Sequence, residues 1–449
     1  MENGRVCYAH PTLHLPGTLF ATETTQQATE SIPFYEKESI ILENLAQTLT
    51  WIIAGLILVQ AAMLIVYARF LYRFRQPALV DNECPRAAVI LCVRGLDPFL
   101  PACLTGLFRQ DYPDYDVWIV VDSTRDAAWP VVNKLAQQSG KHNIHVLPLT
   151  ERLATCSRKI AGILQAISHI DASHEIVVLL DSDTIPHAAW LRELAAPLKD
   201  PRVGVSSGNR WYMPATPTAG SLVRYLWNVA AVVQMYWYKI GWGGSLAIKA
   251  KFLKQSDLRQ RLANAFGEDS TICRCAQAHG YRIAFSPPLV MVNRESCSVK
   301  GVFGFLERQL LTVRLHNPWW WAVVGHGIAT TAMLGFCCLL GLVAAATDHS
   351  IAAAWIGTAL ATYWASMIVL ILPLEWCTRR IVRERGETIT GFGAWGWLSI
   401  AMAVPLTQIV HFSALVSAMF ARTHRWRGVL YQFYGPSPVR VIEDTEEIA

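Results

Sequence analysis

Long apolar runs stand toward both ends of the chain, and a region of shorter, alternating patterns lies between them. The first run covers residues 46–68 and is long enough to cross a bilayer core, which needs about 20 residues. Two more runs cover residues 319–346 and 351–374, and a fourth, longer stretch covers residues 392–421. The pattern therefore predicts transmembrane α-helices that flank a central domain.

The fourth stretch does not fit one ordinary span. Pro405 lies near its middle, where proline removes a helix hydrogen bond. A single crossing would leave Arg422, Arg425 and Arg427 on the outer side, against the usual charge distribution. About 30 residues are too few for two full spans. They suit a re-entrant helical hairpin, which the pattern slightly favours, or a tilted and kinked single span.

Charges beside the spans predict the orientation of the protein. The N-terminal segment 1–45 is net acidic, whereas Arg69, Arg73 and Arg75 follow the first span. Because cytosolic loops carry the excess of lysine and arginine, we expect residues 1–45 outside and the central domain in the cytosol. Basic residues after the third span agree with this: Arg379, Arg380, Arg383 and Arg385. Residues 422–449 then form a C-terminal tail.

Composition supports a multi-pass membrane protein with a folded, cytosol-facing domain. Of the 449 residues, 53% are hydrophobic and 16% are charged, whereas soluble domains have about a quarter charged residues. Intrinsic disorder is excluded. The net charge of +5 is spread without a long basic run, so we expect no nucleic-acid partner. The 11 cysteines show no CxxC pair, and reduced, buried thiols fit a cytosol-facing domain.

The central region, residues 82–317, has the alternating pattern of an α/β domain. Short apolar runs at 87–93, 116–122 and 175–183 are separated by helical patterns. Such alternation predicts a Rossmann-like, mostly parallel sheet that is buried on both faces. Ligands bind such sheets at the carboxyl ends of the strands. Three carboxylates stand at these ends: Asp122, Asp181 and Asp183.

Asp181 and Asp183 are candidate metal ligands. In an extended segment, side chains two positions apart point to the same side. Carboxylate oxygens at that spacing suit Mg²⁺ or Mn²⁺ shared with the phosphates of a substrate. Aspartate is also common in turns, so the triplet alone is a weak signal that the preceding apolar run strengthens.

A second acidic pair, Glu268 and Asp269, precedes a helical pattern that ends at Gly280. Negative charge is favourable at a helix N-terminus, so the pair could simply cap this helix. The alternative is a general base that points into the ligand cleft. The residues themselves leave both interpretations open.

Six motifs, taken in order, resemble those of membrane-bound family 2-like glycosyltransferases. They are GLDP (95–98), DYPDYDVWIVVD (111–122), LLDSD (179–183), GWGGSLAIK (241–249), GED (267–269) and RQLLTVR (308–314). The chain is most similar to the ceramide glucosyltransferase-like branch and its bacterial relatives. The resemblance covers about residues 85–320, the layout of the spans and WRGVLY (426–431), and it implies a GT-A-type fold.

The resemblance implies that the domain binds a nucleotide sugar, usually a UDP-sugar. It assigns Asp122 to the uracil or ribose, and it places Asp97 and Lys159 near the nucleotide. For Lys159, a solvated helix charge fits the sequence equally well. Asp181 and Asp183 would hold the ribose and the metal ion that bridges the diphosphate.

The resemblance also implies the catalytic groups. Asp269 would deprotonate the acceptor hydroxyl for a direct displacement that inverts the anomeric carbon, and Glu268 would tune its pKa. Gly243, Gly244 and Ser245 would form a loop beside the sugar and the acceptor, where small residues leave room.

The late motif departs from the family pattern (Q/R)-x-x-R-W. Arg308 and Gln309 are present, but Leu311 and Thr312 stand where arginine and tryptophan are expected. Arg314 or Arg308 could supply the missing cation to the diphosphate leaving group. The change weakens the acceptor assignment and argues against polymer synthesis, which depends on that motif.

The sequence therefore predicts an inverting, metal-dependent glycosyltransferase. It would move a sugar from a UDP-sugar to a membrane lipid, ceramide-like or another lipid hydroxyl, at the cytosolic face. A processive polysaccharide synthase is the first alternative, although three or four spans are few for a channel. A catalytically silent membrane protein is the second, and the four aspartates of the motifs argue against it. The sequence carries no signal for an oligomeric state.

Overall fold

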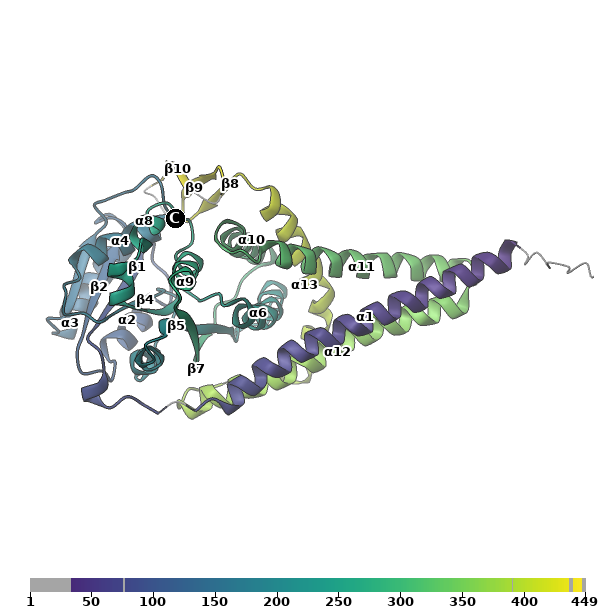
Figure 1. The fold of residues 1–449 in the computed structure, drawn as a ribbon, viewed down its shortest axis with the longest axis horizontal. Helices are drawn as coiled ribbons and strands as arrows, with labels where there is room; N and C mark the ends of the chain where they lie inside the picture. The colour runs from purple at the N-terminus through teal and green to yellow at the C-terminus, as the bar shows by residue number, and fades with distance from the viewer. Residues whose placement is uncertain (1–33, 76, 390, 436–438, 446–449) are drawn as a thin grey trace, which may run out of the picture.

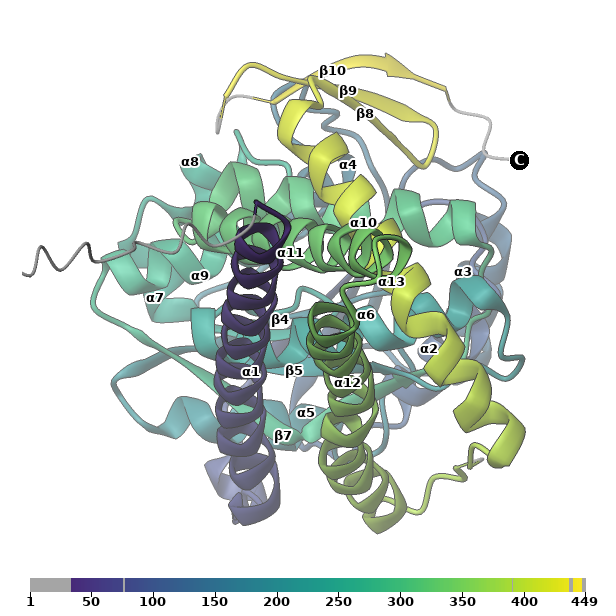
Figure 2. The same cartoon turned by 90° about the vertical axis from the view of Figure 1, so that its right-hand side faces the viewer.

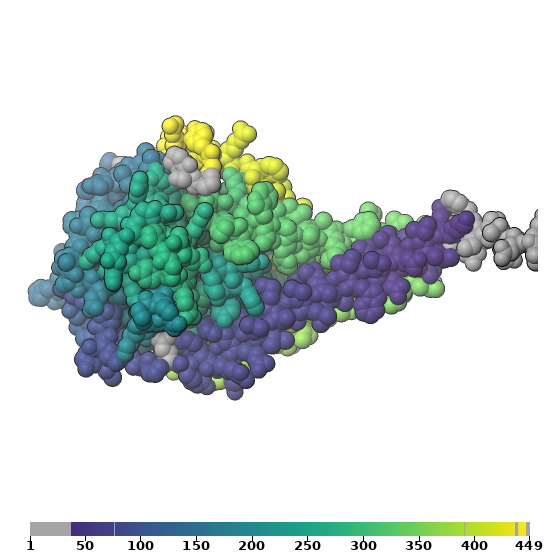
Figure 3. Space-filling view, viewed as in Figure 1, coloured from purple at the N-terminus to yellow at the C-terminus, as the bar shows by residue number. Residues whose placement is uncertain are grey.

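The computed structural model describes residues 34–75, 77–389, 391–435 and 439–445. It shows a head built around a seven-stranded sheet, a long arm of three helices, and a small three-stranded sheet at one edge of the head (Figure 1). The space-filling view shows the arm projecting well beyond the head (Figure 3). Of the predicted N-terminal segment, residues 1–33 lie outside the described residues.

The sheet of the head is mostly parallel, as predicted. Its strand order is β3-β2-β1-β4-β6-β5-β7, and β6 alone runs antiparallel to its neighbours, β4 and β5. The strands are β1 Ala87–Val93, β2 Tyr115–Val121, β3 Ile144–Pro148, β4 Ile176–Leu180, β5 Val203–Tyr212, β6 Ser245–Lys249 and β7 Arg282–Asn293.

Helices cover both faces of this sheet because successive strand side chains point to opposite sides. Val89 and Leu91 of β1 pack in the core with α2, α3 and α5, whereas Ile90 packs in the core with α4 and α7 to α9. The helices of the head are α2 Leu100–Phe108, α3 Ala128–Ser139, α4 Arg158–His169, α5 Trp190–Ala195, α6 Ala219–Tyr238, α7 Ala250–Gln255, α8 Leu258–Leu262, α9 Glu268–Ala278 and α10 Val299–His316, with 3-10 helices η1 Asp81–Glu83 and η2 Ala196–Lys199.

The arm consists of α1 (Phe34–Arg73), α11 (Trp320–Ala346) and α12 (Ser350–Glu384). Each is long and apolar enough to cross a membrane, and large apolar side chains such as Trp51 and Leu339 are exposed on them. In Figure 1, α1 and α12 run side by side toward the head. The helix α1 begins 12 residues before the predicted span at 46, because hydropathy marks the apolar part of a helix and not its ends.

The fourth apolar stretch forms one continuous helix, α13 (Ala394–Phe420), and the re-entrant hairpin that the sequence favoured is wrong. Pro405 lies inside this helix on its exposed side. Proline removes only one backbone hydrogen bond there, and α13 packs against α6 and α10 of the head along its length. Figure 2 shows α13 running across the arm and not parallel to it.

The segment predicted as a C-terminal tail contains an antiparallel sheet, which we call the C-terminal sheet. Its strands are β8 (Thr423–Trp426), β9 (Val429–Phe433) and β10 (Val439–Asp444), in the order β10-β9-β8. Tyr431 and Phe433 of β9 are buried against Phe266 of the head, with ring centroids 5.2 and 5.1 Å apart. This aromatic contact attaches the end of the chain to the head.

Candidate active site

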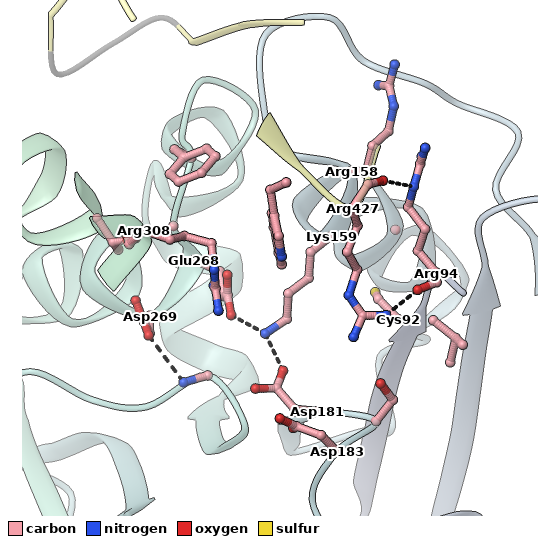
Figure 4. Close-up of a pocket in the computed structure, with 18 of the residues that line it drawn as sticks. Cys92, Arg94, Arg158, Lys159, Asp181, Asp183, Glu268, Asp269, Arg308 and Arg427 are labelled. Carbon is pink, nitrogen blue, oxygen red and sulfur yellow. Dashed lines mark hydrogen bonds and ion pairs between the residues drawn. The ribbon is translucent and has the colours of Figure 1, made fainter. Parts of the chain in front are cut away.

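A pocket opens at the carboxyl ends of β1, β2 and β4, between the head and the C-terminal sheet (Figure 4). This is the edge at which parallel sheets bind ligands. The structure brings most of the predicted site residues together in the pocket lining: Asp122, Lys159, Asp181, Asp183, Gly243, Glu268, Asp269, Arg308 and Gln309.

Three other predicted residues lie beside or beneath the pocket. Asp97 stands at its edge, with Oδ2 3.6 Å from Nη2 of Arg427. Gly244 lies directly under Asp181, because a Cβ there would come within 2.7 Å of a carboxylate oxygen. Ser245 is fully buried and accepts a hydrogen bond from the Trp190 indole at 2.9 Å, so it supports the loop from below.

Arg314 lies elsewhere. Its guanidinium donates to the backbone carbonyls of Ala418 and Met419, in the last turn of α13. A cation is favourable at a helix C-terminus, where the last carbonyls lack intrahelical partners. The position of Arg314 therefore contradicts the idea that it supplies a cation to the pocket.

Asp181 and Asp183 follow the fully buried strand β4, and both are held by cations. Nζ of Lys159 lies 2.5 Å from Oδ1 of Asp181, and Nη1 of Arg210 lies 3.2 Å from Oδ2 of Asp183. Burial raises the pKa of Asp181, but Lys159 and Arg210 outweigh it and hold the pKa below its ordinary value. The pKa of Asp183 is raised, mainly by burial and also by the nearby Asp181 and Asp97.

Lys159 is positioned by the start of α4. The hydroxyl of Ser157 caps this helix by accepting from the N–H of Ile160. Lys159 then lies in the first turn and bridges Asp181 and Glu268, as Figure 4 shows. Its side chain is 16% exposed, so the alternative of a solvated helix charge does not hold.

Asp269 occupies the first turn of α9 and faces the pocket. Its Oδ1 accepts from the N–H of Ser270 at 2.6 Å, and its Oδ2 accepts from the N–H of Gly243 at 3.4 Å. Burial and the neighbouring Glu268 raise the pKa of Asp269 to about 6. The Asp269 carboxylate thus accepts one backbone N–H of the first turn of α9, and its raised pKa lies nearer to neutral pH than that of an ordinary aspartate.

The loop at Gly243 needs its glycine. A Cβ at this position would overlap the carboxylate of Glu268, which cannot simply swing away because it is ion-paired with Lys159. The absence of a side chain lets the loop approach α9 closely enough for its N–H to reach Asp269.

Asp122 ends β2 and is almost fully buried between two arginines. Its carboxylate lies 3.0 Å from Nη1 of Arg94 and 3.1 Å from Nη2 of Arg152. Arg94 directly follows β1 just as Asp122 directly follows β2, so the strand-end rule that found Asp122 could also have found Arg94. Sequence reasoning did not select it, nor Arg158 and Arg210.

The C-terminal sheet contributes side chains that sequence reasoning did not place in a site. Trp426, Arg427 and Tyr431 line the pocket, and the Arg308 guanidinium lies 4.8 Å from the centroid of the Trp426 ring. On α10 itself, Leu311 is buried in the core and Thr312 lines the pocket. The sequence noted WRGVLY only as a similarity, and no local spacing connects residue 426 with residue 308.

The fold is similar to that of a solved mannosyltransferase from Pyrobaculum calidifontis, which is in complex with GDP-Man and Mn²⁺. The two chains share 20% identity with a TM-score of 0.54, over 84% of this chain and 99% of the other. This likeness supports the predicted GT-A-type fold.

Two fungal ceramide glucosyltransferases match parts of the chain. That of Pyricularia oryzae is 33% identical over 78 residues, which are 17% of this chain and 16% of the fungal protein. That of Gibberella zeae is 27% identical over 177 residues, or 36% of this chain and 33% of the fungal protein. The matched segments thus span a third or less of each relative.

The family comparison covers almost the whole molecule. The model of glycosyl transferase family 21 matches residues 49–435, from within α1 to just past β9. This span includes most of the arm, the head with its pocket and α13. The chain belongs to glycosyl transferase family 21.

Proposed function

We propose that the protein transfers a sugar from a UDP-sugar to the hydroxyl group of a membrane lipid, with inversion of the anomeric carbon, at the cytosolic face. The observation that carries this proposal is the position of Asp269. It is a partly buried carboxylate with a pKa of about 6, in the same pocket as Asp181 and Asp183. A base with such a pKa is largely ionised at neutral pH and still accepts a proton effectively.

The proposed reaction is a single displacement. Asp269 accepts the proton of the acceptor hydroxyl while the oxygen attacks the anomeric carbon. The bond between this carbon and the diphosphate oxygen breaks, and UDP leaves with the bonding electrons. Because the attack comes from the face opposite the leaving group, the anomeric carbon inverts. Glu268 is held by Lys159 and contributes negative charge that raises the pKa of Asp269.

The donor would lie along the ends of β1, β2 and β4. Asp122 is proposed to contact the uracil or the ribose, and Arg94 and Arg152 fix its carboxylate. Asp97 and Lys159 are proposed to lie near the nucleotide, with Asp181 at the ribose. The relatives give partial support, since the solved mannosyltransferase holds a nucleotide sugar.

The residues present fit a Mg²⁺ or Mn²⁺ ion held by Asp183 together with Asp181. Both offer hard oxygen ligands to the pocket. The pKa of Asp183 is raised first by burial and then by the nearby carboxylates of Asp181 and Asp97, and a divalent ion would offset that negative charge. When bound, such an ion supplies Lewis-acid stabilisation of the diphosphate. The solved mannosyltransferase of similar fold is in complex with Mn²⁺.

The arm and α13 support a lipid acceptor. Before α13, Arg385 donates to the carbonyls of Pro288 and Val290 on the head, both at 2.8 Å. After α13, the C-terminal sheet packs on the head. Because both ends of α13 are held by the head, we propose that it does not cross the membrane. It would lie along the cytosolic surface with its exposed apolar stripe toward lipid: Trp395, Leu398, Met402 and Ile409.

Protease protection in sealed vesicles tests this topology. We expect a C-terminal tag to share the accessibility of a tag placed in the head, because three crossings leave both on one side. A tag protected on the opposite side from the head would refute the surface position of α13.

The donor and acceptor are tested with membranes that contain the purified protein. A panel of labelled UDP-sugars is supplied, with labelled GDP-mannose as the matched donor control, and lipid extract is separated from high-mass polymer. We expect label from one UDP-sugar in the lipid fraction. Label in polymer would indicate a processive synthase, and label from GDP-mannose alone would refute the UDP-sugar assignment.

A further inference from the structure

The tip of the β8–β9 hairpin reaches into the pocket. The turn consists of Arg427 and Gly428, which have φ angles of 44° and 77°. These left-handed values are those of a tight two-residue hairpin turn, for which Asn-Gly and Asp-Gly are the preferred pairs. Arginine is not a residue that such a turn favours, because its Cβ is strained at positive φ.

The side chain of Arg427 is directed at the carboxylates of the pocket. Figure 4 shows it extending into the cavity above Asp181 and Asp183. Its Nη2 lies 3.6 Å from Oδ2 of Asp97, and its Nη1 donates to the backbone carbonyl of Arg94. The side chain is 37% exposed, so the guanidinium is held from one side and open to the pocket on the other.

A network of charged contacts holds the hairpin tip in place. Arg94 donates from Nε to the carbonyl of Arg427 at 2.9 Å, so the two arginines bind each other's backbone. At the same end of the C-terminal sheet as the turn, Asp444 of β10 pairs with Val429. Its carboxylate lies 2.9 Å from Arg94, 2.9 Å from Arg152 and 2.8 Å from Arg158. Such shared, largely buried ion pairs fix geometry better than one exposed pair.

From this geometry we propose that Arg427 binds the diphosphate of the donor and stabilises the negative charge that develops on the leaving UDP. This deepens the proposed function and rests on it. A planar guanidinium suits a diphosphate because it offers parallel N–H donors to phosphate oxygens. The contact strengthens as the bond to the anomeric carbon breaks and charge accumulates, which is the condition for catalysis.

The strained turn supports this assignment. If the hairpin served only to close the edge of the head, asparagine at position 427 would make the same turn with less strain. Backbone strain at a pocket is retained where the side chain has a function there. No other side chain of the turn offers a cation, since its second residue is glycine.

The turn chemistry provides a sharp test, the substitution Arg427→Asn. It removes the cation and gives the turn its preferred residue pair, so the hairpin should stay folded and the melting temperature should not fall. We expect kcat for transfer to drop by about 100-fold. We also expect UDP to bind about tenfold more weakly, with UMP affinity unchanged, because only UDP carries the outer phosphate.

Two further variants complete the design. Arg427→Lys keeps the charge and should retain more activity than Arg427→Asn. Arg425→Asn removes an exposed arginine on the same hairpin that pairs with Glu443 outside the pocket, and it should leave kcat and UDP affinity unchanged. Unaltered kcat in Arg427→Asn would overturn the proposal, and so would parallel losses of UDP affinity, UMP affinity and melting temperature.

The donor for these assays is whichever nucleotide sugar the wild-type protein uses. If that donor carries another base, the UDP part of the proposed function fails. The role of Arg427 is then tested with the matching nucleoside diphosphate and monophosphate. The two ideas therefore fail separately.

Discussion

The two walls of the pocket differ in charge and in origin. The acidic wall comes from strand ends and α9, with Asp181, Asp183 and Asp269 on local motifs of the α/β domain. The basic and aromatic wall combines Arg308 of α10 with Trp426 and Arg427 of the C-terminal sheet. Each carboxylate of the acidic wall is positioned by the strand or helix next to it in the sequence. The side chains of the other wall come together only because distant segments of the chain pack against each other.

The difference shows why the walls depend on each other. Buried charges without partners cost several kcal/mol each. The C-terminal sheet, which carries Trp426 and Arg427, is joined to the head by ion pairs of Asp444 with Arg94 and Arg158. The acidic wall carries the proposed base and metal ligands, whereas the other wall carries the cation proposed for the leaving group. Variants on each wall should therefore lose different parts of the reaction.

The largest effect is expected at Asp269. Replacement by asparagine keeps the shape but removes the proton acceptor, so transfer should fall by about 10³-fold. Donor affinity should survive, as shown by binding of labelled donor to the variant. The matched control is Asp257→Asn, an exposed carboxylate near α9 that pairs with Arg261. If Asp269→Asn turned over at nearly the wild-type rate, Asp269 would not be the general base.

The next effect concerns the metal ligands. Asp183→Ala should lower transfer by about 100-fold and weaken the dependence of UDP binding on Mn²⁺. Titration of UDP binding with Mn²⁺ measures this. The control is Asp114→Ala, because the side chain of Asp114 is 61% exposed and lies outside the pocket lining. A variant whose UDP binding stays as sensitive to Mn²⁺ as wild type would show that Asp183 does not hold the ion.

A moderate effect is expected from pH. Because burial raises the pKa of Asp269 to about 6, the carboxyl is protonated below that pH and cannot accept the acceptor proton. The rate should be level above pH 6 and fall about tenfold per unit below it. The pH profile of kcat measures this, and Asp269→Asn should lack the acidic limb. If the rate fell only near pH 4, the pKa of Asp269 would be that of an ordinary aspartate.

The smallest effect is expected at Arg314, outside both walls. Arg314→Gln loses the charged contacts to the last carbonyls of α13, which should lower stability by about 1–2 kcal/mol. Transfer by the folded protein should stay within about twofold of wild type. Thermal unfolding and kcat measure the two quantities, with the exposed Lys300→Gln on the same helix as control. A large fall in kcat without a loss of stability would show that Arg314 acts in the reaction after all.

Much of the fold could be predicted because its signals are local. The apolar runs around β1, β2 and β4 predicted buried strands, and the strand-end rule led to Asp122, Asp181 and Asp183. Local signals could not decide whether residues 392–421 form a hairpin or one helix. Pro405 is a local signal for a break, but the contacts of α13 with α6 and α10 stabilise a continuous helix.

Sequence similarity identified the late motif but not the aromatic side chains that surround Arg308 in the structure. Arg308 and Gln309 lie in the pocket as expected. The Arg308 guanidinium lies 4.8 Å from the ring centroid of Trp426, in the C-terminal sheet, and 5.8 Å from that of Phe305, on its own helix. Arg314 was a reasonable candidate by spacing. Its helix position points it toward the end of α13 instead.

The sequence by itself determined the α/β class, the apolar helices, the acidic wall and the family, because strand ends and motifs act over a few residues. Only the tertiary structure decided that α13 lies across the arm and that Trp426, Arg427 and Tyr431 of the C-terminal sheet complete the pocket. It also decided that Asp444 joins three arginines from distant loops and helices. These contacts depend on which surfaces pack together, and no local pattern in the chain encodes that choice.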